Sequence, residues 1–156
     1  NAVASDVLSL LEHQFDKGRV RVRRELSATP VPVVGHEFKL QQVFLNLFLN
    51  ARDAMPSGGW LTIATRIEGG RALADVRDTG AGVAPEHLAR IYDPFFTTKG
   101  IGRGTGLGLS ISYGIIQEHA GSIQCESAVG QGTRFLLSFA AATSGSGHVL
   151  RQGAGQ

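Results

Sequence analysis

The sequence predicts an α+β fold, a two-layer sandwich in which a mixed five-stranded sheet is covered on one face by helices. Apolar residues change between helical spacing and strand spacing along the chain. Successive strands are joined by short turns, so hairpins dominate and helices lie between them, as is typical of this fold class. The length of 156 residues and the hydrophobic content of 42% suit one domain with one core.

The first part of the chain predicts a helix, a strand and a second helix. Apolar residues at helical spacing predict a short helix over 3–12. Valines that alternate with arginines predict a half-exposed strand over 19–26. The longest helical pattern covers 37–55 and ends before Pro56.

The second part predicts two strand pairs with helices between them. The expected elements are strands over 61–67 and 72–78, a short helix over 85–91, a loop over 93–105, a helix from 107, and strands over 122–127 and 133–139. Gly69-Gly70 suits a tight hairpin turn between the first pair. A loop as long as 93–105 in a compact domain is usually functional. Residues 1–142 are expected to form the domain, and 143–156 a flexible tail or linker.

Composition excludes several classes of protein. The net charge of +2 is small, and the dense arginines lie within 19–24, so we expect no binding of nucleic acid. The single cysteine, Cys125, excludes an internal disulfide framework and is expected in the core. No apolar run approaches the roughly 20 residues that span a bilayer. We therefore expect a cytoplasmic domain without membrane contact, whose full-length protein is either soluble or anchored through other segments.

Polar residues form a stripe along the apolar helix over 37–55. Gln42, Asn46, Asn50 and Asp53 are spaced so that they share one side of the helix. Amide and carboxylate oxygens suit a hydrated Mg²⁺ and a polyphosphate. The alternative is a helix with one solvent-facing edge, and this helix alone does not decide between the two.

A second candidate site begins at a strand end, at Asp78. This residue shares the parity of Val76, so its carboxylate should point inward and need a hydrogen-bond donor such as an adenine amine. Gly80 and Gly82 would let the backbone pass close to a flat ring. Thr133 faces inward by the same parity argument, where its hydroxyl could support a base or a water molecule beside Asp78. Each motif alone also fits an ordinary turn.

The third candidate is the loop and the glycine run after it. Phe95 and Phe96 are expected to anchor the loop to the body of the domain. The second glycine run opens a helix, whose free N–H groups and dipole bind anions. No G-K-[ST] follows, so this is not a P-loop. The residues expected to contact phosphates are Thr98, Lys99, Gly102, Arg103, Gly104, Thr105, Gly106, Leu107 and Gly108.

These motifs together resemble the ATP-binding superfamily of histidine kinases, gyrases and MutL. The run 46–55 is similar to its N box, 78–82 to its G1 box, 94–99 to its F box, 102–108 to G2, and 130–135 to its last glycine motif. Their order and spacing agree over roughly residues 35–140. The motif Pro-Phe-Phe-Thr-Thr-Lys at 94–99 resembles that of sensor kinases of the nitrogen-regulation type. The resemblance implies a Bergerat-type ATP-binding sandwich with a long ATP lid.

The resemblance also implies roles for single residues. Asn50 would coordinate Mg²⁺, which bridges the ATP phosphates, and Asn46 would support the same region. Asp78 would accept a hydrogen bond from the adenine amine, with Thr133 helping through water and with Gly80 and Gly82 shaping the pocket. The segment 93–105 would be the lid. Lys99, together with Asn46 and Asn50, would act in catalysis.

One departure from the family bears on the reaction. Branches that hydrolyse ATP carry a glutamate one turn before the metal-binding asparagine, where this chain has Asn46. An amide is no general base at neutral pH. The resemblance therefore implies phosphotransfer to an external histidine rather than hydrolysis. A non-enzymatic nucleotide sensor and a true ATPase are the alternatives.

The phosphoacceptor histidine is expected to lie outside this chain. His36-Glu37 is the nearest dipeptide to an acceptor motif, but it follows two prolines and a glycine at the entry to a helix. The implied partners are a dimerisation domain with the acceptor histidine and the receiver domain of a response regulator. Residues 1–12 are either the end of that dimerisation domain or an element of this one. The isolated chain is expected to be monomeric.

Overall fold

The computed structural model describes residues 1–97 and 107–142. The elements are α1 (Ala2–Lys17), β1 (Val20–Glu25), α2 (Glu37–Ala54), β2 (Gly59–Glu68), β3 (Arg71–Asp78), α3 (Pro85–Leu88), α4 (Gly108–Glu118), β4 (Ser122–Ala128) and β5 (Gly132–Ala140). Their order is the expected one. The helix expected over 3–12 runs on to Lys17 because Phe15 continues its buried stripe. The helix expected over 85–91 is a single turn without buried residues.

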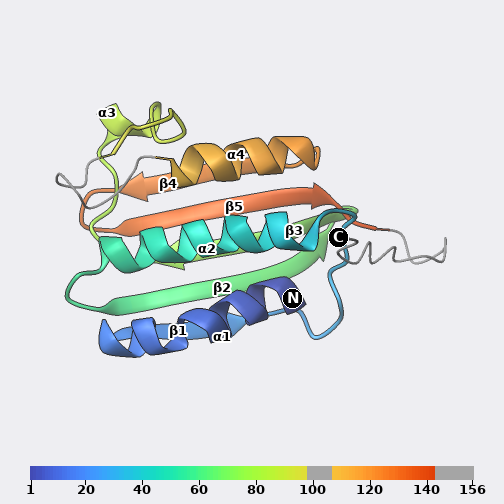
Figure 1. Ribbon diagram of the computed structural model, residues 1–156, viewed down its shortest axis with the longest axis horizontal. Helices are drawn as coiled ribbons and strands as arrows, with labels where there is room; N and C mark the ends of the chain where they lie inside the picture. Colours follow the sequence, from blue (N-terminus) through green and yellow to red (C-terminus); the bar gives the residue numbers. More distant parts are fainter. Residues whose placement is uncertain (98–106, 143–156) are drawn as a thin grey trace, which may run out of the picture.

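The strands form one mixed sheet in the order β1-β2-β3-β5-β4. β1 pairs with β2 in parallel, through the crossover helix α2, and all other pairs are antiparallel. Helices α1, α2 and α4 cover one face of this sheet (Figure 1). The predicted two-layer α+β sandwich is therefore confirmed. Among the described helices, none is long and apolar enough to cross a membrane.

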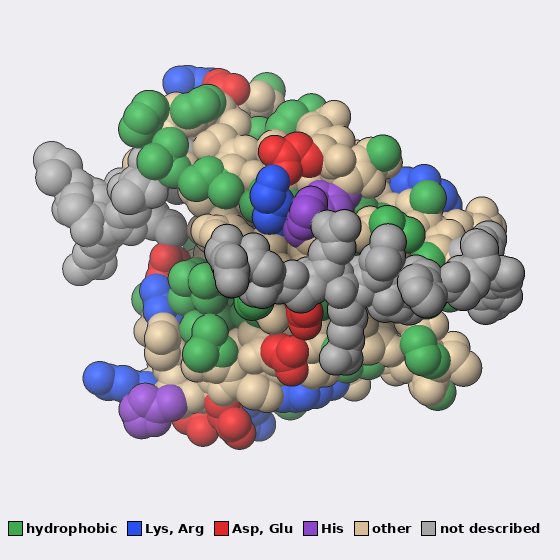
Figure 2. All heavy atoms as spheres, turned by 45° about the vertical axis from the view of Figure 1, so that its right-hand side comes forward, with side chains coloured by type: hydrophobic (Ala, Val, Ile, Leu, Met, Phe, Trp, Pro, Cys, Tyr) green, Lys and Arg blue, Asp and Glu red, His purple; other side chains and the backbone are tan. Residues whose placement is uncertain are grey.

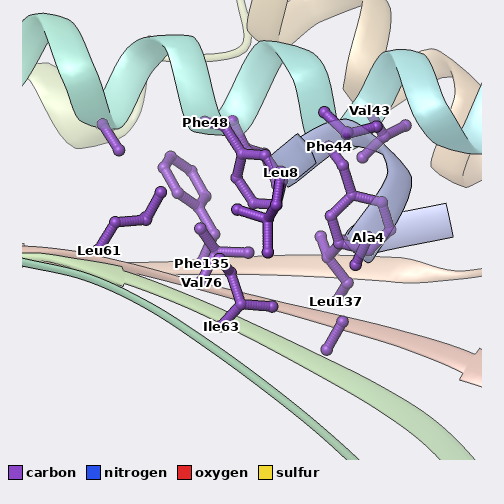
Figure 3. Close-up of a cluster of buried hydrophobic side chains, with 14 of the residues drawn as sticks. Ala4, Leu8, Val43, Phe44, Phe48, Leu61, Ile63, Val76, Phe135 and Leu137 are labelled. Carbon is purple, nitrogen blue, oxygen red and sulfur yellow. The ribbon is translucent and has the colours of Figure 1, made fainter. Parts of the chain in front are cut away.

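The core lies between the helices and the inner face of the sheet (Figure 3). Alternate strand residues such as Leu61, Ile63 and Leu137 are 0% exposed, and Phe48 of α2 packs among them. The hairpin between β2 and β3 turns at Gly69 and Gly70 with positive φ at both, as a tight two-residue turn requires. Burial raises the pKa of the Cys125 thiol to about 11, so this core cysteine stays protonated at neutral pH.

The buried side of α4 gives a test of how tightly this core is packed. Replacement of Ile116, which is 0% exposed, by valine should lower the free energy of unfolding by about 1 kcal/mol, because one methylene is lost from a filled interior. Ile111→Val in the same helix is the matched control, since Ile111 is 43% exposed. Urea titrations should show no measurable change for the control. Equal loss in both variants would contradict the assignment of the buried side.

The face of the sheet without helices carries a buried carboxylate that the sequence analysis did not identify. Asp75 is 1% exposed, and the Arg134 guanidinium donates to both of its oxygens at 2.7–3.0 Å. Arg77 lies 3.3 Å and Arg66 3.9 Å from the same carboxylate. We name this group the Asp75 cluster; it links β2, β3 and β5.

Candidate functional site

Three segments that are distant in sequence meet beside the C-terminal half of α2. Asn46 contacts the first turn of α4, and the Ala54 carbonyl accepts a hydrogen bond from the Ala81 N–H after β3. Eight residues of α-helix separate these two contacts, which is about 12 Å along the axis. Asn50 lies midway between them. The end of β3 and the start of α4 are thus held at a fixed spacing along one helix.

Asp78 is the last residue of β3 and pairs with Thr133 of β5, as the parity of the strands predicted. The Gly80 N–H donates to the Asp78 carboxylate at 2.8 Å. Burial raises the pKa of Asp78, and hydrogen bonds from the backbone of Gly80 and Thr133 oppose this rise. Asp78 is half-buried, and an open hollow at this end of the sheet is lined by Asp78 and Thr133 together with Arg77 and Arg134.

The glycines after Asp78 are required by contacts within the chain itself. A Cβ on Gly80 would lie 2.5 Å from the Ala54 carbonyl oxygen. Gly82 has a φ of +75°, and its Cβ would lie 2.0 Å from the Ala128 carbonyl oxygen. Both contacts are with backbone atoms, which cannot rotate away. The glycines therefore bring this loop against α2 and the end of β4, and their expected role beside a flat ring remains a prediction.

Ser127 joins the loop after β3 to the inward hydroxyl of Thr133. Its Oγ accepts from the Val83 N–H at 2.7 Å and lies 2.8 Å from the buried Thr133 Oγ1. It also donates to the Gly132 carbonyl at 2.9 Å. Ser127 was not predicted from the sequence, although it shares the inward parity of Cys125 in its strand, and that parity is the signal that identifies it.

Ser127 should therefore contribute to the stability of this end of the sheet. Ser127→Ala leaves the half-buried Val83 N–H and the buried Thr133 hydroxyl without this partner, so we expect the free energy of unfolding to fall by about 1–2 kcal/mol. Ser122→Ala, at the exposed start of the same strand, is the control. Thermal unfolding of both variants distinguishes them. A Ser127→Ala variant as stable as its control would show that water replaces the hydroxyl.

Asn46 has a defined partner on α4. Its Nδ2 donates to the Gly108 carbonyl at 3.0 Å and to Ser112 Oγ at 3.1 Å, and Ser112 is 0% exposed. Within the described residues no side chain caps α4 at Leu107. The first turn of α4 is therefore held by α2 from the side, and the N-terminus of a helix is a place where an anion can bind. Ser112, a polar residue among apolar positions of this helix, was likewise not predicted from the sequence.

The other polar residues of α2 have different environments. Asn50 is half-buried one turn after Asn46. Asp53 is exposed and forms an ion pair with Arg52 at 2.9 Å. Gln42, the first residue of the stripe, is exposed beside a groove between α1 and α2. The described residues hold no group of three or more His, Cys, Asp or Glu that could bind a metal. The amide oxygen of Asn50, with oxygens of a bound phosphate, suits Mg²⁺.

The segment before the lid is anchored by one of its two phenylalanines. Phe96 packs 5.5 Å from the His87 ring and lies 4.7 Å from the Arg90 guanidinium. Phe95 is 73% exposed with a φ of 66°, so the expectation that both phenylalanines anchor the loop was wrong for Phe95. The positive φ turns its side chain away from the body. Hydrophobic side chains gather at the upper left of Figure 2, toward the end that carries α3 in Figure 1.

A tyrosine pair connects this segment to α4. Tyr92 stacks on Tyr113 with ring centroids 5.2 Å apart, and burial raises the pKa of the Tyr92 hydroxyl. The remaining candidates for phosphate contact lie outside the described residues: Thr98, Lys99, Gly102, Arg103, Gly104, Thr105 and Gly106. Leu107 and Gly108 are described and form the start of α4.

The fold and the site together define a nucleotide-binding α+β sandwich. The half-buried carboxylate at the end of β3 suits a base, the asparagine on the adjacent helix suits a metal ion, and the first turn of α4 suits a phosphate. The chain belongs to the family of histidine kinase-, DNA gyrase B- and HSP90-like ATPases, which matches residues 35–143.

Within that family the chain is similar to sensor histidine kinases. It is 44% identical over 121 residues to the sensor kinase CckA of Brucella abortus (strain 2308), a match that covers 68% of this chain and 13% of that protein. It is 37% identical over 136 residues to sporulation kinase E of Bacillus subtilis (strain 168), covering 86% of this chain and 18% of that protein. The chain thus spans a small part of these relatives.

The solved structures that this chain resembles are also histidine kinases. The catalytic domain of the histidine kinase ThkA, in a nucleotide-free form, superposes with a TM-score of 0.81 and 30% identity over 90% of this chain and 91% of that one. Full-length ShkA in complex with AMPPNP matches with a TM-score of 0.80 and 28% identity, over 93% of this chain and 30% of that one. The predicted resemblance to histidine kinase catalytic domains is confirmed.

Proposed function

We propose that this chain binds Mg·ATP and places its γ-phosphoryl group for transfer to a histidine on a separate phosphoacceptor domain. The observation that carries the proposal is the partly desolvated Asp78 carboxylate at one end of the site, with Asn46 and the start of α4 at the other. The relatives named as sensor kinases support this function. The structural neighbour ShkA, which was solved in complex with AMPPNP, also supports it.

The residues of this chain would act by binding and orientation. Asp78 accepts a hydrogen bond from the adenine amine, which distinguishes adenine from guanine because guanine presents a carbonyl oxygen there. Thr133, held by Ser127, supports the base or a bridging water. Asn46 fixes the first turn of α4, so the N–H groups of that turn meet the phosphates in a set geometry.

Mg²⁺ would be held by Asn50 and the phosphates, where it neutralises phosphate charge. Asp53 lies one turn further along α2, where its carboxylate is paired with Arg52, and it is proposed as a further contact to the bound nucleotide and its metal. Lys99, Thr98 and the glycines of 102–106 are proposed as lid contacts to the phosphates. In-line phosphoryl transfer needs little more from the protein than positioning and charge neutralisation.

Hydrolysis by the isolated chain is not part of this proposal. Asn46 lies where an ATPase of this superfamily carries its general base, and its Nδ2 is engaged with Gly108 and Ser112. Neither an amide nor these partners can deprotonate water at neutral pH. The chain should therefore turn over ATP slowly without an acceptor.

The acceptor histidine is proposed to lie on a dimerisation domain of the full-length protein, with a response regulator receiver domain as the next acceptor. His36 is not proposed as the acceptor, because it lies at the entry to α2, where its ring packs edge-on against that of His119. α1 buries Val7, Leu8 and Leu11 in this core, which favours it as an element of the catalytic domain. We further propose a cytoplasmic location and a monomeric isolated chain.

A transfer assay in trans tests the proposal. The chain is mixed with the separately purified phosphoacceptor domain and γ-labelled ATP, and acid-labile phosphate on that domain is measured. Label is expected on the acceptor, and Asn50→Ala should abolish it, while Gln41→Ala on the same helix should not. Binding of Mg·ATP without transfer would instead indicate a nucleotide sensor. Rapid steady-state release of phosphate by the chain alone would indicate an ATPase.

A further inference from the structure

On the face of the sheet that carries no helices, most arginines are neutralised. Arg66, Arg77 and Arg134 each lie within 4 Å of the Asp75 carboxylate. Glu126 lies 3.4 Å from Arg134, and Glu25 lies 3.9 Å from Arg77. The charges around the Asp75 cluster are therefore compensated within the chain, and this part of the face has no need of an acidic partner.

The arginines of β1 differ from this pattern. Arg21 and Arg23 are exposed and face the same side of the sheet as the Asp75 cluster, because Val22 between them faces the core. Arg19 and Arg24 are exposed at either end. In the described part of the chain no carboxylate lies within ion-pair distance of these four guanidinium groups. Positive charge is thus left uncompensated along one strand.

Arg21 and Arg23 share one indole ring. The Trp60 ring lies 4.7 Å from the Arg23 guanidinium and 5.6 Å from that of Arg21, and Trp60 is 38% exposed. Stacking on an aromatic face orients a guanidinium and covers its plane, while its N–H donors at the edge stay free for a carboxylate. We name these three residues the Arg21–Trp60–Arg23 stack. It is an ordered donor array, not a set of freely moving charges.

β1 is also an edge of the sheet (Figure 1). It pairs only with β2, and no described residue hydrogen-bonds to the backbone of residues 20–25 on the other side. An open strand edge can accept an added strand. A second copy of β1 would bring arginines against arginines, so the edge repels itself. An acidic strand would be attracted instead.

We propose that β1 and the Arg21–Trp60–Arg23 stack form a docking site for an extended acidic segment of a partner protein. The segment adds to the sheet beside β1 by backbone hydrogen bonds. Acidic residues at every second position of the segment face Arg21 and Arg23, because alternate side chains of a strand share one face. The site lies on the opposite face of the sheet from Asp78 and Thr133, so it does not depend on the proposed phosphotransfer function.

The tryptophan makes the site directly observable, since Trp60 is the only tryptophan of the chain. The probe is a labelled peptide of four Glu-Thr repeats, compared with a peptide of the same composition in which the glutamates and threonines form two blocks. Trp60 emission and peptide anisotropy are followed at low salt. Saturable binding of the alternating peptide is expected, at least fivefold tighter than that of the block peptide, and weaker as salt is added.

Variants with equal changes of charge locate the binding site. Arg23→Glu should weaken peptide binding at least tenfold. Arg71→Glu, on the same face but outside the stack, should change it less than twofold. Far-UV circular dichroism and the melting temperature should be nearly unchanged in both variants, which shows that they are folded.

The proposal is overturned if Trp60 emission does not saturate, or if both peptides bind equally. Equal loss of binding in the two variants would show attraction by net charge alone and would also overturn it. The proposal is also overturned if a single-stranded oligonucleotide of the same charge displaces the peptide and binds more tightly. That result would show that β1 and the Arg21–Trp60–Arg23 stack recognise nucleic acid instead.

Discussion

Replacement of Asp78 by asparagine is expected to weaken Mg·ATP binding about 10- to 100-fold while the domain stays folded. A hydrogen bond to a charged group contributes about 1.5–3 kcal/mol when its loss leaves a polar group unsatisfied. The carboxylate accepts from the adenine amine, whereas an asparagine can turn its own NH₂ toward that amine. Its Oδ1 can still accept from the Gly80 N–H, as the Asp78 carboxylate does.

The fold should not lose stability in this variant, and the pKa of Asp78 gives the reason. Burial raises this pKa in the folded state, so the folded state binds the proton more tightly than the unfolded state does. Between the pKa of Asp78 in the unfolded state and its higher pKa in the folded state, the free energy of unfolding therefore falls as the pH rises. Above both values the ionised carboxylate destabilises the folded state. Asp78→Asn removes this cost at neutral pH. We expect its melting temperature to equal or exceed that of the unsubstituted chain.

The same shift predicts how binding depends on pH. Mg·ATP affinity should fall as the pH decreases through the raised pKa of Asp78, because the protonated carboxyl is a weaker acceptor. This dependence should be absent in Asp78→Asn. Calorimetric titrations at several pH values provide the measurement, with Asp16→Asn, an exposed residue of α1, as the control. Equal affinity of Asp78→Asn and the unsubstituted chain would refute the adenine contact.

Gly82→Ala is expected to have the largest effect on stability of the substitutions considered, with a loss of about 3 kcal/mol or more. Two costs combine at this position. The φ of +75° is unfavourable for alanine by about 1–2 kcal/mol. In addition, the new Cβ would lie 2.0 Å from the Ala128 carbonyl oxygen, so the backbone itself must move.

Gly69→Ala separates these two costs. Gly69 has a φ of +58°, but a Cβ there meets no atom within 4 Å. Its substitution should therefore cost only the conformational part, about 1 kcal/mol. Only Gly82→Ala should also weaken Mg·ATP binding, because the displaced loop carries the Gly80 N–H that donates to Asp78. Equal destabilisation of both variants by urea would show that the loop shifts without resistance.

The side of a strand on which a residue lies could be predicted from the sequence, because it depends only on the residues next to it in the chain. Strand parity placed both Asp78 and Thr133 on the inner face, and the sheet pairs them directly. The two-residue turn at Gly69 and Gly70 was equally local. In both cases the residues adjacent in sequence are enough to predict the local structure.

Side chains whose environment comes from distant segments could not be assigned in this way. By strand parity alone, Asp75 belongs to the outer side of its strand, which carries no helices. Its burial depends on Arg134, 59 positions away, together with Arg66 and Arg77. Asn46 was identified as a polar residue of the site, but its bonds to Gly108 and Ser112 depend on how α2 and α4 pack. Phe95 and Phe96 are adjacent and chemically identical, and only the local backbone turns one outward.

The position of β1 has a consequence for the energetics of the whole sheet. This strand has one neighbour, which it reaches only through the long crossover of α2, whereas β3 and β5 each have two. A ligand that binds beside β1 would give it a second neighbour and would bind the folded chain but not the unfolded one. By mass action such a ligand raises the free energy of unfolding. Binding of a partner beside β1 and the stability of the ATP-binding sheet are then thermodynamically linked.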